Sequence, residues 1–222
     1  MNPLSSIRAV IFDFDGVIAD TIPLHFQSFR ELFAAEGVDF SFEDYKTVAN
    51  GAARAQTIRA VMDEGLTEEK FQFLMDRKEQ ITFELAARNG LHRNPGVIEF
   101  ARACKDRGLL LGMASSSRMA VQFVEMLGYQ DLFDAMSDSR EVERAKPSPD
   151  VFLLTARKLD IHPEQCLVVE DSVVGVQAGH NAGMSVLGVT TTTTAEKLKN
   201  ADWIVDDFEG LDPARFLGEP SS

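Results

Sequence analysis

The chain has 222 residues, of which 45% are hydrophobic, and it carries a formal net charge of −13 at pH 7. An acidic surface of this kind repels nucleic-acid backbones and anionic membranes, and no apolar run approaches the roughly 20 residues of a membrane-spanning helix. The two cysteines, Cys104 and Cys166, are too few for a disulfide framework, and the first apolar run is too short for a signal peptide. We therefore expect a cytoplasmic globular protein with reduced thiols that binds neither nucleic acid nor a membrane.

Short apolar runs alternate with helical patterns over most of the chain. We predict strands at residues 8–12, 109–114, 135–137, 167–169, 185–189 and 204–205. The helical patterns between them cover residues 97–107, 118–127, 149–159 and 173–182. This alternation indicates an α/β fold, with a Rossmann-like parallel sheet covered by helices on both faces. A run of five threonines, residues 190–194, follows one of these strands, and we expect it to be a loop.

Residues 18–90 interrupt this alternation. Their amphipathic patterns predict helices at residues 25–36, 42–48, 54–63 and 67–88, and no strand stands out among them. The apolar residues Phe26, Phe29, Leu32 and Phe33, for example, recur at helical spacing. We expect an all-helical cap domain, residues 18–90, inserted into an α/β core domain made of residues 1–17 and 91–222.

Three of the predicted strands end in polar residues of complementary kinds. The first is followed by Asp13 and Asp15, and a later strand ends in Glu170-Asp171-Ser172 just before a helix. The second strand leads into a helix through Ser115, Ser116, Ser117 and Arg118. Parallel strands bring these ends to one edge of the sheet, which is where α/β proteins bind their ligands.

Together these residues supply the parts that phosphoryl transfer requires: a carboxylate nucleophile, hydroxyl groups at a helix N-terminus and clustered carboxylates for Mg²⁺. A cation beside the phosphate is also needed, and Lys146, followed by Pro147 and Pro149, is the best candidate. The prolines also favour a helix start directly after this segment.

Each motif has a simpler explanation when it is taken alone. The aspartates are typical of turns, serines at 115–117 and Ser172 are typical helix caps, and a single lysine is usually solvated. A calcium loop fits poorly, because it has glycine at its sixth position and glutamate at its twelfth. Counting from Asp13, glycine stands at the fourth position and Leu24 at the twelfth. The combination of motifs favours chemistry, and we also expect one serine of 115–117 to cap the following helix.

The motifs occur in an order that resembles the haloacid dehalogenase superfamily. They are Asp13-x-Asp15-Gly16-Val17, Ser115 after an apolar strand, Lys146-Pro147 and Glu170-Asp171. Within the superfamily, the chain is most similar to members with a helical cap that are like β-phosphoglucomutase and phosphoglycolate phosphatase. The resemblance covers nearly the whole chain, from Ile7 to about Phe208.

The resemblance implies a role for each matching residue. Asp13 is expected to attack phosphorus and become an aspartyl phosphate, and Asp15 to act as the general acid and base. Phosphate binding is assigned to Ser115, Ser116 and Lys146. The metal Mg²⁺ is expected on the Asp13 carboxylate, the Asp15 carbonyl and the Asp171 carboxylate, with Glu170 nearby.

The resemblance also extends into the helical segment. Thr21, His25, Gly51, Arg54 and Lys78 match positions of the β-phosphoglucomutase pattern and are expected to act on substrate. Ser117 and Arg118 are further candidates for substrate contact. Two positions depart from the mutase pattern: Asn50 replaces a lysine and Ala53 replaces a serine. These departures favour a hydrolase over a mutase.

The leading hypothesis is a monomeric Mg²⁺-dependent phosphatase that hydrolyses a small phosphorylated metabolite, such as a sugar phosphate, through an aspartyl phosphate. The alternative is a β-phosphoglucomutase-type enzyme that uses the same intermediate, and a third possibility is a non-catalytic protein that binds phosphometabolites. A dehalogenase is disfavoured, because dehalogenation needs no Mg²⁺ and leaves Asp15 and Glu170-Asp171 without a purpose.

Overall fold

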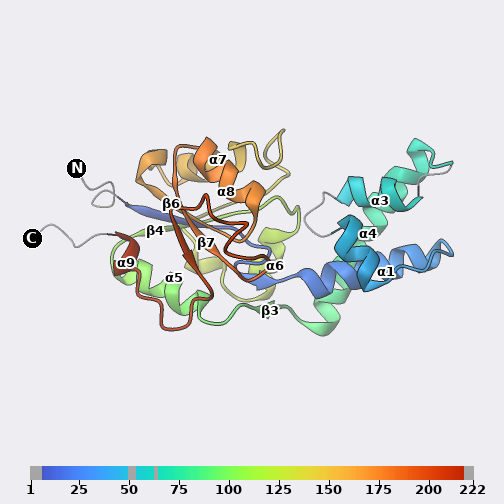
Figure 1. Ribbon diagram of the computed structural model, residues 1–222, viewed down its shortest axis with the longest axis horizontal. Coiled ribbons are helices and arrows are strands. Elements are labelled where there is room, and N and C mark those ends of the chain that lie inside the picture. The colour runs from blue at the N-terminus through green and yellow to red at the C-terminus, as the bar shows by residue number, and fades with distance from the viewer. Residues whose placement is uncertain (1–6, 50–53, 63–64, 218–222) are drawn as a thin grey trace, which may run out of the picture. The chain divides into compact units, whose positions relative to one another are not determined.

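The computed structural model describes residues 7–49, 54–62 and 65–217 (Figure 1). The chain divides into two compact units. The helical unit is Thr21–Leu91, and the α/β unit contains the described residues up to Asp20 and from His92 onward. Residues 18–20, which we expected in the helical part, belong to the α/β unit, because β2 (Ala19–Asp20) pairs with β3 (His92–Arg93) in a small antiparallel sheet.

The α/β unit is built on a parallel sheet of six strands in the order β5-β4-β1-β6-β7-β8. The strands are β1 (Ala9–Phe12), β4 (Leu110–Ala114), β5 (Ala135–Ser137), β6 (Cys166–Glu170), β7 (Ser185–Val189) and β8 (Trp203–Val205). The predicted α/β fold with a Rossmann-like parallel sheet is therefore confirmed. Along the chain, β4 and β5 are added on one side of β1, and β6, β7 and β8 are then added on its other side. The carboxyl ends of β1 and β6 thus lie at the point where the strand order reverses, which is where such sheets bind ligands.

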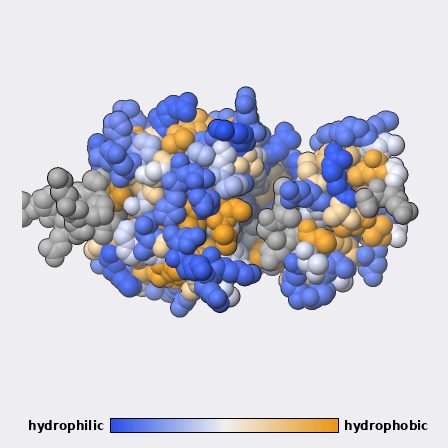
Figure 2. All heavy atoms as spheres, turned by 45° about the horizontal axis from the view of Figure 1, so that its top comes forward, coloured by the Kyte–Doolittle hydropathy of each residue, from blue (hydrophilic) through white to orange (hydrophobic). Residues whose placement is uncertain are grey.

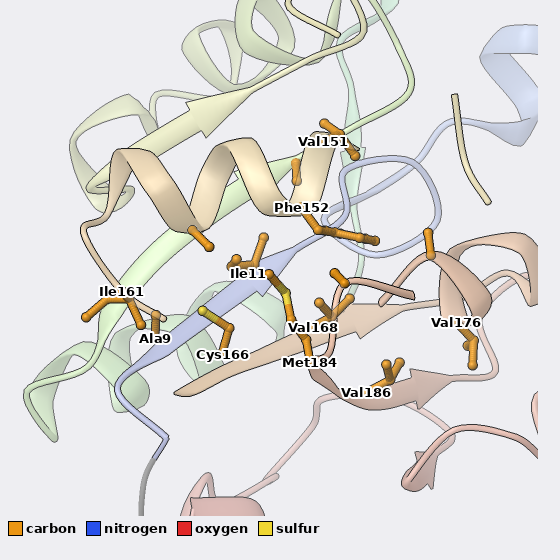
Figure 3. Close-up of a cluster of buried hydrophobic side chains, with 14 of the residues drawn as sticks. Ala9, Ile11, Val151, Phe152, Ile161, Cys166, Val168, Val176, Met184 and Val186 are labelled. Atoms are coloured by element: carbon orange, nitrogen blue, oxygen red, sulfur yellow. The ribbon is translucent and has the colours of Figure 1, made fainter. Parts of the chain in front are cut away.

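Alternate residues of the strands pack against different helices, as the pleat of a strand requires. Ala9 and Ile11 of β1 belong to the cluster formed with α7 and α8 (Figure 3). Phe12 points the other way and contacts Phe100 of α5 edge to face. The helices of this unit are α5 (Val97–Asp106), α6 (Ala120–Met126), α7 (Asp150–Lys158), α8 (Val173–Asn181) and α9 (Ala214–Leu217), with short 3-10 turns η3 (Gln130–Leu132) and η4 (Pro163–Gln165).

The helical unit has its own hydrophobic core. Its elements are α1 (Ile22–Ala35), α2 (Phe42–Asp44), the π-helix η2 (Tyr45–Ala49), α3 (Arg54–Met62) and α4 (Glu68–Asn89). Buried aromatic and aliphatic side chains from these helices, including Phe29, Phe33, Ile58 and Leu74, pack together. The helix predicted at 42–48 instead begins as α2 and continues as a π-helix. Ser41 starts it with a reciprocal capping box to Asp44, which satisfies backbone N–H groups at the helix start.

The visible surface of each unit is mainly hydrophilic (Figure 2). Figure 2 shows hydrophilic residues over much of the visible face of each unit, with hydrophobic residues in smaller patches. Within the part of the chain that the structure describes, no helix combines the length and the apolar character needed to cross a membrane.

Candidate active site

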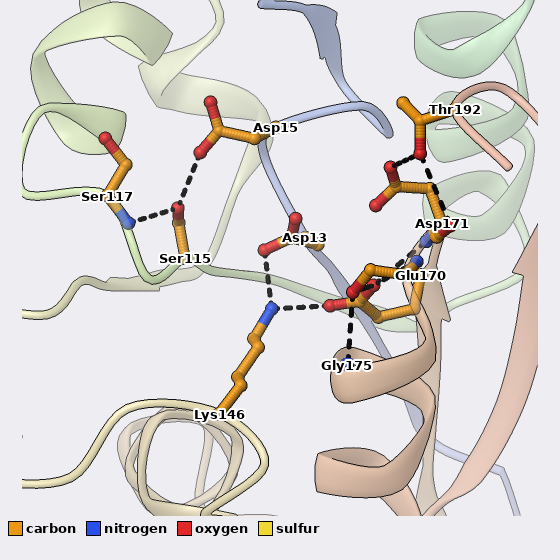
Figure 4. Close-up of polar contacts among 10 residues, drawn as sticks. Asp13, Asp15, Ser115, Ser117, Lys146, Glu170, Asp171, Gly175 and Thr192 are labelled. Atoms are coloured by element: carbon orange, nitrogen blue, oxygen red, sulfur yellow. Dashed lines mark hydrogen bonds and ion pairs between the residues drawn. The ribbon is translucent and has the colours of Figure 1, made fainter. Parts of the chain in front are cut away.

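Asp13 directly follows β1 and is the centre of the site (Figure 4). Its backbone N–H donates to the Val169 carbonyl, 2.9 Å away on β6, which extends the pairing of the two strands by one step. The residue is only 6% exposed, and its side-chain Oδ1 accepts a hydrogen bond of 2.7 Å from Lys146 Nζ. A short hydrophobic strand thus ends in a buried carboxylate at the edge of the sheet where ligands bind.

Lys146 joins Asp13 to the end of β6. Its ammonium group lies 2.6 Å from Glu170 Oε1 and 2.7 Å from Asp13 Oδ1. Burial lowers the pKa of Lys146, but the carboxylates of Asp13 and Glu170 outweigh that effect, so its pKa lies above the ordinary value. The lysine is therefore a permanent cation. The helix that was expected after its prolines is also confirmed, because α7 begins at Asp150.

Glu170 is held by the start of the following helix. Its Oε2 accepts hydrogen bonds from the backbone N–H groups of Asp171 and Ser172 and from the Ser172 hydroxyl, at 2.9 to 3.0 Å. Ser172 is the N-cap of α8, which was the simpler explanation of this residue, and it accepts from the Gly175 N–H. A Cβ atom at Gly175 would lie 1.8 Å from Glu170 Oε1, so only glycine leaves room for this carboxylate.

The carboxylates of Asp13, Glu170 and Asp171 form the group that fits a metal ion. Each offers one oxygen within 4.8 Å of the others, and all three residues are buried. Against three carboxylates the cluster has one ammonium group, from Lys146, which leaves a surplus of negative charge when all are ionised. Burial, together with neighbouring carboxylates, raises the pKa of Asp13 well above 3.8 and that of Asp171 to about 8. A divalent cation with oxygen ligands would offset this surplus, so the residues fit Mg²⁺.

Asp15 lies in different surroundings from Asp13. It is half-buried, and the Ser115 hydroxyl donates to its Oδ2 at 3.3 Å. Ser115 is buried at the end of β4, and its Oγ accepts from the Ser117 N–H at 2.9 Å. Two aspartates in unlike environments can take unlike chemical roles.

The remaining residues of the Ser115–Arg118 segment differ in exposure and in contacts. Ser116 and Arg118 are exposed. The expectation that a serine caps the following helix was wrong: the N-cap of α6 is Met119, which forms no side-chain cap. Ser117 Oγ instead accepts from the Met119 N–H, so the serines organise the loop before the helix begins.

Four residues that shape the site were not predicted from the sequence. One is Gly175, and a second is Asn94, whose amide donates to the carbonyls of Gly16 and Val17 at 2.6 and 2.9 Å. The others are Thr191 and Thr192. Only the threonine run could have been found from the sequence. It follows a predicted strand of the parallel sheet, so it begins at the edge of the sheet where Asp13 and Asp171 lie.

The helical unit contains most of the other predicted substrate residues. Thr21 is buried directly before α1, and Lys78 Nζ lies 2.9 Å from His25 Nδ1. Arg54, the first residue of α3, pairs with Glu79 at 2.8 Å. Gly51, together with the departures Asn50 and Ala53, lies outside the described residues.

A model of the family described as haloacid dehalogenase-like hydrolase matches residues 10–189, from β1 to the end of β7. The chain belongs to this family. The protein is therefore an enzyme, and its strand-end motifs occupy the matched region.

Two relatives and one solved structure extend the comparison. The chain is 34% identical over 193 residues to β-phosphoglucomutase of Bacillus subtilis (strain 168), covering 82% of this chain and 83% of the relative. It is 31% identical over 184 residues to phosphorylated carbohydrates phosphatase of Thermotoga maritima, covering 80% and 82%. The structure of β-phosphoglucomutase from Clostridium difficile matches with a TM-score of 0.82 at 28% identity, covering 94% of this chain and 95% of that one. The relatives thus include a mutase and a phosphatase.

Proposed function

We propose that this protein is a Mg²⁺-dependent phosphatase that hydrolyses a small sugar phosphate or a similar polyol phosphate. The observation that carries the proposal is the buried Asp13 carboxylate, which Lys146 contacts at 2.7 Å within a cluster of three carboxylates. The family match and the phosphorylated carbohydrates phosphatase of Thermotoga maritima support the same class of reaction.

In the first half of the reaction, an oxygen of Asp13 attacks phosphorus and forms an aspartyl phosphate while the bond to the ester oxygen breaks. Asp15 donates a proton to that leaving oxygen. In the second half, water attacks the same phosphorus and gives its proton to Asp15. Asp13 leaves as a carboxylate, and inorganic phosphate is released. Lys146 and the Ser115 hydroxyl bind phosphate oxygens during both halves.

Asp13 and Asp171 are the proposed carboxylate ligands of Mg²⁺, with the Asp15 carbonyl as a further ligand and Glu170 nearby. When bound, Mg²⁺ supplies positive charge that lowers the repulsion between the Asp13 carboxylate and an anionic phosphate ester. The charge surplus of the buried cluster supports this assignment.

A second candidate is a phosphomutase of the β-phosphoglucomutase type. It shares the first half-reaction and differs only in the acceptor, which is a substrate hydroxyl group instead of water. The β-phosphoglucomutase of Bacillus subtilis and the retained His25, Arg54 and Lys78 favour it, whereas Asn50 and Ala53 do not. Substrate contacts by Thr21, His25, Gly51, Arg54, Lys78, Ser116, Ser117 and Arg118 remain predictions.

A phosphate-release screen over small phosphate esters tests the proposal. It runs beside an isomerisation assay with β-glucose 1-phosphate and a catalytic amount of a glucose bisphosphate. Phosphate release without isomerisation is the expected result, and efficient isomerisation with little release would establish the mutase.

Removing divalent cations with a chelator should stop turnover, and added Mg²⁺ should restore it. Turnover that ignores the chelator would contradict the proposed metal dependence. Light scattering in solution tests the predicted monomer.

A further inference from the structure

The five threonines after β7 lie at the edge of the sheet that carries the site. β7 is the neighbour of β6, and both strands run in the same direction, so the loop after β7 emerges beside Glu170 and Asp171. The Thr191 hydroxyl donates to the Gly16 carbonyl at 2.5 Å. The Thr192 hydroxyl contacts Asp171 Oδ2 and also lies 3.4 Å from the Asp171 carbonyl oxygen (Figure 4). Two consecutive threonines therefore bind the turn after β1 and the acidic end of β6.

The Asp171 side chain is confined on two sides. A Cβ atom at Gly16 would lie 2.1 Å from Asp171 Oδ2 and 2.7 Å from Thr192 Cγ2, so the backbone of Gly16 closely approaches both residues. Gly16 also has a φ of +77°, a conformation that other residues rarely adopt. Oδ2 lies against this backbone and accepts a hydrogen bond from the Thr192 hydroxyl. The other oxygen of Asp171, Oδ1, is therefore the one available to a cation.

The contact has the form of an outer hydrogen bond to a metal ligand. Carboxylates that bind metals are commonly held by such a partner, and removing the partner typically weakens metal affinity about 10- to 100-fold. Thr192 has the chemistry for this, because its hydroxyl donates a hydrogen bond without adding charge to the buried cluster.

We propose that Thr192 is a positioning residue that orients the Asp171 carboxylate for cation binding, while Thr191 holds the Gly16 turn against the same loop. This inference rests on the proposed function, since it takes Asp171 to be a ligand of Mg²⁺. In this proposal Thr192 acts through Asp171, so its effect should appear in metal affinity before it appears in the chemical step.

Titration calorimetry with Mg²⁺ alone, on the full chain without substrate, tests the proposal. Thr192→Val removes the hydroxyl and keeps the shape of the side chain, and it should raise the dissociation constant for Mg²⁺ about tenfold. Thr192→Ser, which retains the hydroxyl, should bind Mg²⁺ nearly as the wild type does. Thr194→Val is the matched control, because Thr194 belongs to the same run and is exposed, and it should leave the affinity unchanged.

A kinetic measurement separates positioning from a general structural effect. The Mg²⁺ concentration for half-maximal rate should rise in Thr192→Val, while kcat at saturating Mg²⁺ stays close to that of the wild type. If Thr192→Val folds poorly, Thr192→Ala removes the same hydroxyl and carries the same expectation.

The outcomes distinguish the two proposals. Wild-type protein that binds no Mg²⁺ would overturn the metal site and this inference together. Wild-type protein that binds Mg²⁺, with Thr192→Val binding it equally well, would overturn only the positioning role.

Discussion

A buried lysine side chain lies in each of the two units, and the surroundings of the two lysines differ. In the α/β unit, Lys146 faces the carboxylates of Asp13 and Glu170 at 2.7 and 2.6 Å. In the helical unit, Lys78 Nζ lies 2.9 Å from an imidazole nitrogen of His25 and 4.7 Å from the centre of the Phe29 ring. The first lysine partly offsets a surplus of acid, whereas the second contacts a titratable base and an aromatic face. The two lysines therefore lie in unlike electrostatic surroundings, so substitutions in the two units should have effects of different kinds.

The largest expected effect is that of replacing the nucleophile. Asp13→Asn should reduce turnover by at least about a thousandfold, because an amide oxygen cannot form the aspartyl phosphate. The fold should persist, since the substitution keeps the shape of the side chain and lowers the negative charge of the cluster. Steady-state kinetics and circular dichroism measure the two effects. A variant that retains more than a small fraction of the rate would remove Asp13 from the mechanism.

Replacing the second aspartate should have an effect that depends on the leaving group. Asp15→Asn should slow hydrolysis of sugar phosphates about 10²- to 10⁴-fold, because their alkoxide leaving groups need a proton. An aryl phosphate with an acidic phenol needs little protonation, so its aspartyl-phosphate formation should be slowed much less. Burst kinetics isolates this first step from the later attack by water. Equal losses for both esters would contradict the acid role.

The lysine of the helical unit should give a smaller effect of a different kind. Lys78→Met should raise KM for the best sugar phosphate about tenfold, which corresponds to about 1.4 kcal/mol of lost binding. Arg77→Met is the matched control, because Arg77 is the preceding residue on α4 and is only half-buried. Equal KM changes in both variants, or a lowered unfolding temperature with unchanged KM, would argue for a purely structural Lys78.

The last prediction concerns stability, not turnover, and its dependence on pH without metal. Burial raises the pKa of Asp171 from 3.8 to about 8, so the folded state binds a proton that the unfolded state has released. Stability from this group is present below about pH 4 and is lost as the pH rises toward about 8. Thermal unfolding without Mg²⁺ should therefore occur at lower temperatures as the pH rises over this range.

Two controls sharpen that measurement. Added Mg²⁺ should stabilise the protein most at the alkaline end, where the carboxylates are ionised, and Asp171→Asn should flatten the pH dependence. An equally steep slope in Asp171→Asn would place its origin in other groups.

Much of the α/β unit could be read from the amino-acid sequence. Strands β5 and β7 coincide with the predicted ranges, and β1, β4 and β6 differ by one residue at one or both ends. Local hydrophobic runs determine where a strand forms, and a parallel sheet brings strand ends together whatever the details of packing. The sequence alone therefore predicts that Asp13, Ser115 and Glu170 lie at one edge of the sheet.

Other features depend on pairs of residues far apart in the chain, and only the tertiary structure decided them. The two-residue strands β2 and β3 exist because residues 19–20 meet residues 92–93, and neither segment has a strand pattern of its own. The pairing of Lys78 with His25 requires two helices to pack in one register. The contacts of Thr192 with Asp171, and of Asn94 with the Gly16 turn, arise in the same way.

The physical reason for this division is the range of the interactions. Periodicity and strand-end chemistry are local properties, so the sequence by itself determined the sheet, the helical insertion and the residue types at the site. Which hydroxyl or amide reaches which carboxylate depends on packing between segments, and a single glycine such as Gly175 decides whether a carboxylate fits at all.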